Sequence, residues 1–327
     1  MMNLITGATG HLGNVLAREL VSRGERVRAL LLPNDIHCPL DGLDVECVEG
    51  DVLDPESLEN AMEHVDTVYH LAGIISILPG ANTVMQRVNV EGVRNVATAA
   101  LNAGVQRFIH VSSVHAFQRM PEGTIVDETA PLAVENAAGT YDMTKAQGTQ
   151  AVLESFRQGL NAVIACPSAI IGPYDFRGSL LGSTLFRFAK QRFQFLVPGA
   201  YDFVDVRDVA HGLTLARDNG RAGEIYILSG TYATLQEAKA TVQRAANVCS
   251  GHLVLPWRIA TACAGAAQHI YRLAHLKPQF TPYALRTLRE NARFSSEKAR
   301  RELGFQTRPL LETTRDLLTW RQSLSPV

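Results

Sequence analysis

The sequence predicts an α/β fold, a Rossmann-type doubly wound parallel sheet with a smaller C-terminal substrate lobe. Short apolar runs alternate with amphipathic stretches through the first 170 residues, and such alternation indicates parallel strands covered by helices on both faces. The first apolar run leads into the glycine-rich turn of ITGATGHLG and then into an amphipathic stretch with Val15, Leu16 and Leu20. At 327 residues and 46% hydrophobic composition, the chain can bury a large core.

The expected strands lie at about 2–6, 26–32, 44–49, 67–72, 106–111 and 160–165, and the expected helices at about 12–23, 55–64, 82–103 and 141–158. Ligands of such a sheet bind beyond the carboxyl ends of its strands. The glycine turn, Asp51, Ser113 and Pro167 all fall at predicted strand ends. These residues therefore point to one cleft.

The pattern changes after residue 170, where Gly172 and Pro173 interrupt the chain. Apolar helical stretches follow at 178–192 and 205–217, and a strand returns at 223–228. We assign residues 1–170 to a dinucleotide-binding domain and 171–327 mainly to a substrate-binding lobe, with the chain passing between the two lobes.

The glycine turn has the features of a dinucleotide-binding site. Gly7 permits the tight turn, Gly10 lets the backbone approach a pyrophosphate, and Gly13 lets helix and strand pack closely. The pyrophosphate would lie at the helix N-terminus, where free N–H groups favour an anion. Thr9, His11 and Leu12 complete the predicted contact set. The alternative is a glycine-rich connection that binds no ligand.

Tyr141 and Lys145 form a candidate acid–base pair in GTYDMTKAQ. On a helix, an offset of four places both side chains on one face. A free phenol titrates at about 10, so the charges of lysine and oxidised nicotinamide would have to lower its pKa before it could accept a proton. The pair also fits an ordinary amphipathic helix, and it gains meaning only beside the glycine turn.

Composition limits the other function classes. A formal net charge of −1 gives no basic footprint for nucleic acid. Five cysteines have no metal-like spacing, so we expect no metal site and a reducing compartment. The first strand begins almost at once and leaves no room for a signal peptide, which indicates a cytoplasmic protein. Residues 255–276 are too polar for a transmembrane segment, but a helix on a membrane surface, a helix lining an apolar pocket and a packed amphipathic helix all remain open.

The pattern GxxGxxG followed by Tyr-x-x-x-Lys resembles the short-chain dehydrogenase/reductase superfamily in its extended form, the NAD-dependent epimerase/dehydratase family. The resemblance runs from residue 2 to about 321. It implies a nicotinamide cofactor, with Tyr141 as general acid/base and Lys145 on the nicotinamide ribose. Further cofactor contacts are implied for Asp51, Val52, Leu71, Ala72, Gly73, Asn89, Pro167 and Ser168.

The same resemblance places a catalytic serine in FIHVSSVHAF. Ser113 aligns better than Ser112 with the hydroxyl that holds the substrate oxygen. Simpler interpretations exist for single residues: Asp51 as a turn or cap residue, His70 as a satisfied histidine at a strand end, and His115 as a surface loop residue.

The C-terminal region resembles dihydroflavonol-reductase-like and 3β-hydroxysteroid-dehydrogenase-like members, through PQFTPY at 278–283, NARFSSEKA at 291–299 and RELGF at 301–305. A plain capped helix that ends at Gly304 also explains the last of these stretches.

The second predicted strand carries neither usual cofactor determinant. NAD-using relatives have an acidic residue at the position of Leu31, and NADP-using relatives of this subfamily have arginine at that of Leu32. Asp35 nearby would repel a 2′-phosphate. NAD is therefore favoured, and NADP remains open.

We predict an oxidoreductase that interconverts a carbonyl and a secondary alcohol on a mid-sized, mostly apolar substrate of steroid, flavonoid or polyketide type. The apolar residues of 176–197 and 74–78 support this choice, although many could be lobe core. A nucleotide-sugar epimerase or dehydratase with retained NAD is the alternative, since Arg177, Arg187, Lys190 and Arg192 could hold a diphosphate. A dinucleotide-sensing regulator is a second alternative. The expected partner is a small-molecule substrate, and homodimerisation is a family-level expectation.

Overall fold

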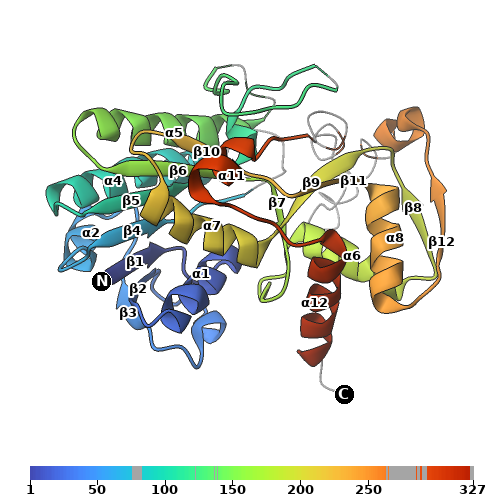
Figure 1. Ribbon diagram of the computed structural model, residues 1–327, viewed down its shortest axis with the longest axis horizontal. Helices are drawn as coiled ribbons and strands as arrows, with labels where there is room; N and C mark the ends of the chain where they lie inside the picture. Colours follow the sequence, from blue (N-terminus) through green and yellow to red (C-terminus); the bar gives the residue numbers. More distant parts are fainter. Residues whose placement is uncertain are drawn as a thin grey trace.

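The first lobe is built on a seven-stranded parallel sheet in the order β10-β6-β5-β4-β1-β2-β3, to which residues 2–167 contribute every strand except β10 (Figure 1). The computed structural model describes residues 1–75, 83–121, 123–135, 137, 139–262, 264, 285, 288 and 293–324. The strands of this sheet are β1 (Met2–Thr6), β2 (Arg26–Leu31), β3 (Glu46–Glu49), β4 (Thr67–His70), β5 (Arg107–Val111), β6 (Ala162–Pro167) and β10 (Ile225–Leu228).

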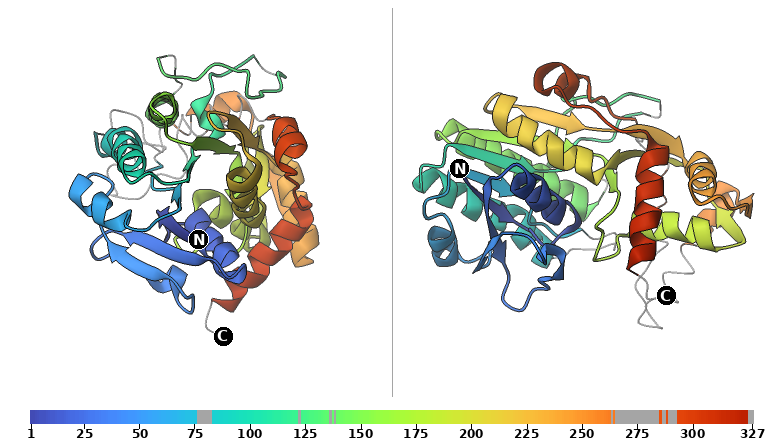
Figure 2. Two further views of the ribbon diagram at one scale, coloured as in Figure 1. Left: turned by 60° about the vertical axis from the view of Figure 1, so that its left-hand side comes forward. Right: turned by 60° about the horizontal axis from the view of Figure 1, so that its bottom comes forward.

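Helices cover both faces of the sheet, as the left view of Figure 2 shows. One face packs against α1 (His11–Ser22) and α7 (Val206–Asn219), and the other against α2 (Pro55–Ala61), α4 (Val93–Asn102) and α5 (Thr140–Arg157). Because side chains alternate along a strand, Ile5 of β1 joins the first core and Leu4 the second. The predicted fold class is confirmed.

In the part of the chain that the structure describes, the second lobe contains two small sheets and three helices of eleven residues or more. Strands β7 (Ala169–Ile171), β9 (Ala200–Asp205) and β11 (Thr231–Thr234) form one sheet in the order β11-β9-β7, and β8 (Phe193–Leu196) pairs in parallel with β12 (Gly251–Val254). Their core is shared with α6 (Leu180–Lys190), α8 (Leu235–Ala246) and α12 (Leu310–Ser323).

The two lobes meet where β6 runs almost directly into β7, with Ser168 between them. The chain returns to the first lobe as α7 and β10, and α11 (Glu297–Leu303) packs on these two elements. Gly304 ends α11 with φ +78°, which confirms the predicted cap.

Several expected elements differ from the structure in detail. The expected helix at 82–103 contains α3 (Thr83–Gln86), a π-helical turn (Arg87–Gly92) and α4. The motif at 278–283 and most of 255–276 lie outside the described residues. Within the described part of the chain, no helix is both long enough and apolar enough to span a membrane.

Candidate active site

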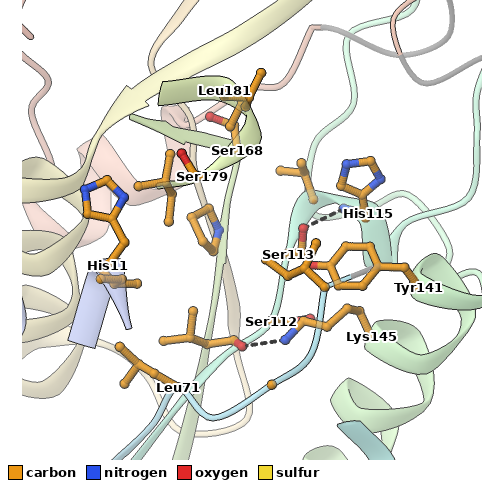
Figure 3. Close-up of a pocket in the computed structure, with 18 of the residues that line it drawn as sticks. His11, Leu71, Ser112, Ser113, His115, Tyr141, Lys145, Ser168, Ser179 and Leu181 are labelled. Atoms are coloured by element: carbon orange, nitrogen blue, oxygen red, sulfur yellow. Dashed lines mark hydrogen bonds between the residues drawn. The ribbon is translucent and has the colours of Figure 1, made fainter. Parts of the chain in front are cut away.

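A pocket of about 460 Å³ lies between the carboxyl ends of the parallel strands and the second lobe. Figure 3 shows His11 and Ser179 on one wall and Ser113, His115 and Tyr141 on the other. The pocket brings together most of the residues predicted from the sequence, namely Gly7, Gly10, His11, Leu12, Gly13, Leu71, Gly73, Ser113, Tyr141, Lys145, Pro167 and Ser168.

The glycine turn has the geometry that the dinucleotide prediction requires. Gly7 has φ +73°, and a Cβ there would lie 2.8 Å from the backbone nitrogen of Ala72. A Cβ on Gly13 would lie 2.1 Å from the carbonyl oxygen of Gly7. No side chain caps the start of α1, so its first N–H groups remain free to bind an anion. The turn therefore fits the pyrophosphate of a dinucleotide.

The opposite wall carries the acid–base pair. Because α5 begins at Thr140, Tyr141 and Lys145 stand one turn apart at the pocket end of the helix. Lys145 Nζ donates to the carbonyl oxygen of Val111 at 2.9 Å, and this bond fixes the ammonium at the end of β5. The hydroxyls of Tyr141 and Ser113 lie near each other in the pocket wall (Figure 3), and Ser113 Oγ accepts from the backbone N–H of His115 at 3.2 Å.

Burial shifts the pKa values of both groups of the pair. It raises the pKa of Tyr141 to about 12, although the hydrogen bond with Ser113 acts in the opposite direction. It lowers the pKa of Lys145 to about 8. The protein groups alone therefore hold Tyr141 as a neutral phenol, and they do not produce the lowered pKa that we expected.

The two adjacent serines have different surroundings. Ser112 also lines the pocket, but its Oγ hydrogen-bonds with Oγ1 of the buried Thr149 at 2.6 Å. Ser113 faces Tyr141. This arrangement favours Ser113 over Ser112 as the group that orients a substrate oxygen.

Five predicted cofactor residues do not line the pocket: Thr9, Asp51, Val52, Ala72 and Asn89. Asn89 holds Ile74 at both backbone groups and donates to Thr144 Oγ1 at 3.1 Å, so it ties the segment after β4 to α5. Asp51 accepts from the backbone N–H of Leu53 at 2.9 Å, as a turn residue does. Their roles toward a cofactor remain predictions.

Two histidines differ from their simpler interpretations. His115 lies in the pocket wall and pairs with Asp142 at 3.0 Å, so it is not a surface loop residue. His70 is fully buried and bonded to Thr6 at 2.7 Å, but its Nε2 has no partner among the described residues.

Sequence reasoning missed a contact between the lobes at the glycine turn. Asp35 accepts from Thr9 Oγ1 at 2.6 Å, and Arg177 of the second lobe donates to Asp35 at 2.6 Å and to Thr9 at 2.8 Å. Burial opposes ionisation of Asp35, but the hydrogen bonds from Thr9, Ile36 and Arg177 outweigh it and lower the pKa. A carboxylate about twenty residues beyond the glycine turn is the known ribose-binding signal, and Asp35 satisfies that spacing.

Asp202 was also not foreseen. It lines the pocket and accepts from Ser168 Oγ at 2.6 Å and from the backbone N–H of Gly230 at 2.7 Å. Burial raises its pKa to about 6. The contact fixes Ser168, the residue expected beside the nicotinamide amide.

The apolar residues of 176–197 separate into three groups. Leu180 and Leu181 line the pocket, whereas Leu185 and Phe188 belong to the lobe core. Phe193 and Phe195 are exposed. Only part of the predicted apolar surface therefore faces a substrate.

Comparison with known proteins identifies the family and relatives of this chain. The family described as NAD dependent epimerase/dehydratase matches residues 3–229. Sterol demethylase protein B of Methylococcus capsulatus is 36% identical over 322 residues, covering 98% of both chains. A putative dihydroflavonol 4-reductase of Synechocystis is 28% identical, covering 98% of this chain and 94% of its own. The crystal structure of gox2253 superimposes with a TM-score of 0.86 at 33% identity, covering 99% of this chain and 98% of the other.

Proposed function

Because the chain belongs to the NAD-dependent epimerase/dehydratase family, we propose that this NAD(P)-dependent oxidoreductase interconverts a carbonyl and a secondary alcohol on an apolar, ring-containing substrate. The observation that carries this proposal is the apolar wall facing Tyr141. Its side chains come from both lobes: Ile74, Ile75, Phe117, Ile170, Leu180, Leu181 and Phe294.

The charges around the pocket argue against a sugar diphosphate, which needs several convergent cations. Of the described residues, only Arg119 and Lys145 are cations in the pocket wall. Arg119 pairs with Asp142, and Arg177 pairs with Asp35. Arg187, Lys190 and Arg192 do not line the pocket. Of the basic residues that would have supported a nucleotide-sugar enzyme, Arg177 is therefore paired with a carboxylate and the other three lie outside the pocket wall.

In the proposed reaction Tyr141 gives a proton to the carbonyl oxygen, and Ser113 positions that oxygen. The nicotinamide supplies the hydride when it is bound. Lys145 holds the ribose and adds positive charge beside the phenol. In the reverse direction Tyr141 receives the alcohol proton, for which the positive charge of the oxidised ring has to lower its pKa.

Asp35 supports NAD as the cofactor. Thr9 and Arg177 already donate to its carboxylate, and the ribose hydroxyls could donate in the same way. A 2′-phosphate would instead meet a negative charge. Leu32, 52% exposed at the end of β2, offers that phosphate no cation.

The proposal is tested with a substrate panel. Hydroxysteroids, dihydroflavonols and aryl ketones are assayed beside UDP- and dTDP-sugars, with nicotinamide absorbance and sugar interconversion followed separately. We expect turnover on at least one apolar class, and its loss in Tyr141→Phe. Sugar interconversion without activity on any apolar carbonyl or alcohol would overturn the proposal.

A further inference from the structure

Strand β8 has an inverted polarity pattern. Phe193 and Phe195 are 54% and 65% exposed, whereas Gln194 between them is 7% exposed. Gln194 Nε2 donates to the carbonyl oxygens of Arg187 and Gln191, but its Oε1 has no partner among the described residues. A strand that buries an amide and exposes two phenyl rings loses stability in water. The pattern indicates that the rings have another apolar environment.

The neighbouring strand extends this apolar surface. The parallel register places Leu253 of β12 beside Phe195, and Leu253 is 53% exposed. The rings of Phe193 and Phe195 contact each other edge-on, with centroids 5.5 Å apart. We call Phe193, Phe195 and Leu253 the distal apolar edge. In Figure 1 it lies at the right-hand end of the molecule, where β8 and β12 form the boundary of the second lobe.

Charge is distributed unevenly around this edge. Residues 176–201 and 238–262 are described throughout and contain seven lysines and arginines and no aspartate or glutamate. Two of the seven do not add to the surface charge near the edge, because Arg177 pairs with Asp35 at the glycine turn and Lys239 is buried. The rest of the chain contains twenty-four basic and thirty-two acidic residues. Lys190, Arg192 and Arg258 are exposed, and none of the carboxylates described in the structure forms an ion pair with them. Three exposed cations, Lys190, Arg192 and Arg258, therefore lie close in the sequence to the distal apolar edge.

We propose that the distal apolar edge docks on an anionic lipid bilayer, with Phe193, Phe195 and Leu253 in the interface and the neighbouring cations at the head groups. Aromatic side chains beside basic residues suit such an interface. A second copy of the chain suits it less, because a twofold interface would bring two basic surfaces together. The proposal rests on the proposed function in one respect: an apolar substrate partitions into membranes, so an enzyme that acts on it gains access to the substrate at the bilayer.

The test measures co-sedimentation of the full chain with vesicles, in the absence of substrate. Vesicles of phosphatidylglycerol and phosphatidylcholine should bind the protein at least about tenfold more tightly than phosphatidylcholine alone, and high salt should abolish the difference. The double variant Phe193→Ser/Phe195→Ser should lose about tenfold in binding. Ile125→Ser, at a residue 60% exposed elsewhere on the surface, is the matched control and should bind normally.

The charge contribution has its own pair of variants. Arg192→Glu should weaken binding to the anionic vesicles, whereas Arg157→Glu at the end of α5 should not. Dinucleotide titration checks that all variants are folded. The proposal would be overturned if the protein did not bind vesicles, or if neither Phe193→Ser/Phe195→Ser nor Arg192→Glu weakened vesicle binding. It would also be overturned if the protein formed a concentration-dependent dimer that the double variant dissociates. Vesicle binding by a protein inactive on every apolar substrate would instead count against the proposed function.

Discussion

The start of α5 at Thr140 brings the hydroxyl of Tyr141 to Ser113 and sets Lys145 one turn below. With its pKa raised to about 12 by burial, the phenol is a proton donor at neutral pH. Lys145, with a pKa lowered to about 8, is close to losing its charge. The protein groups therefore favour protonation of a carbonyl, and proton removal from an alcohol depends on cofactor charge.

Tyr141→Phe removes the hydroxyl and keeps the ring. Turnover should fall by roughly 10²-fold or more, while dinucleotide binding survives. Lys145→Met should lower turnover and also weaken dinucleotide binding, because the lysine is assigned to the nicotinamide ribose and to the phenol of Tyr141. Steady-state rates and fluorescence titration separate the two effects. Retained turnover in Tyr141→Phe would remove the central claim about the proton donor.

The pH dependence of the two directions should differ. Alcohol oxidation needs the phenolate, so its kcat/KM should rise with pH until Lys145 loses its charge above about 8. Carbonyl reduction needs the phenol and should decline only as Lys145 loses its charge above about 8. Since the Ser113 hydrogen bond lowers the pKa of Tyr141, Ser113→Ala should move the oxidation profile to higher pH. A shift to lower pH in that variant contradicts the assignment.

Cofactor preference should depend on Asp35. Wild type is expected to bind NAD at least as tightly as NADP. Asp35→Asn should weaken NAD binding by about tenfold, because a charge-assisted hydrogen bond is lost. Adding Leu32→Arg should then shift preference toward NADP by supplying a phosphate partner. Titration of both cofactors gives the answer, and a wild-type preference for NADP would refute the role of Asp35.

At the scale of elements, the glycine turn positions the start of α1 at the pocket. Gly13 lets α1 pack against the turn, because a Cβ at this position would overlap the carbonyl of Gly7. Free N–H groups at the start of α1 then face the pocket. The turn could be predicted because all its determinants lie within seven consecutive residues.

Other features could not be predicted because they depend on contacts between distant elements. Arg177 meets Asp35 and Thr9 only after the lobes have packed together. The alternating pattern of β8 predicts which side chains share a face, but it does not say which face is inward, and here Gln194 is buried. The raised pKa of Tyr141 also depends on burial that spacing alone does not reveal.

Gly13→Ala should abolish dinucleotide binding and lower the free energy of unfolding by several kcal/mol, since backbone must move to admit the methyl group. Gly24→Ala is the matched control beyond the other end of α1. Gly24 has φ +72° but open space around it, so strain of about 1 kcal/mol is expected with cofactor binding intact. Calorimetry and titration measure both effects. Equal losses of cofactor binding in the two variants would contradict the packing argument.

Across the whole molecule, ion pairs join the two lobes, and a pair of buried histidines lies within the central sheet. Asp208 at the start of α7 pairs with Arg308, which lies two residues before the first residue of α12. Arg207 bridges Asp205 and Asp316, and so joins the end of β9 to α12. Beneath the site, His70 of β4 stacks on His110 of β5 with ring centroids 5.5 Å apart. These rings occupy the centre of the sheet.

The buried histidine pair should make the protein sensitive to acid. Burial lowers the pKa of His70 to about 3, with a smaller contribution from Lys145, and it lowers that of His110 well below its ordinary value. In the unfolded chain both titrate near 6.5. Below that pH the unfolded state binds more protons, so the free energy of unfolding falls as the medium is acidified toward about 3.

The free energy of unfolding should fall with decreasing pH, with a slope that approaches about 1.4 kcal/mol per pH unit for each histidine. Asp202, whose pKa is raised to about 6, opposes the loss because its folded state takes up a proton in the same range. His110→Phe removes one titrating ring and two nitrogens that have no partner among the described residues. Between pH 6.5 and 5 the slope should therefore become shallower by up to about 1.4 kcal/mol per pH unit. His64→Asn, at an exposed residue with φ 58°, should leave the slope unchanged. Urea unfolding followed across this range measures both variants, and an unaltered slope in His110→Phe would show that the pair does not control acid stability.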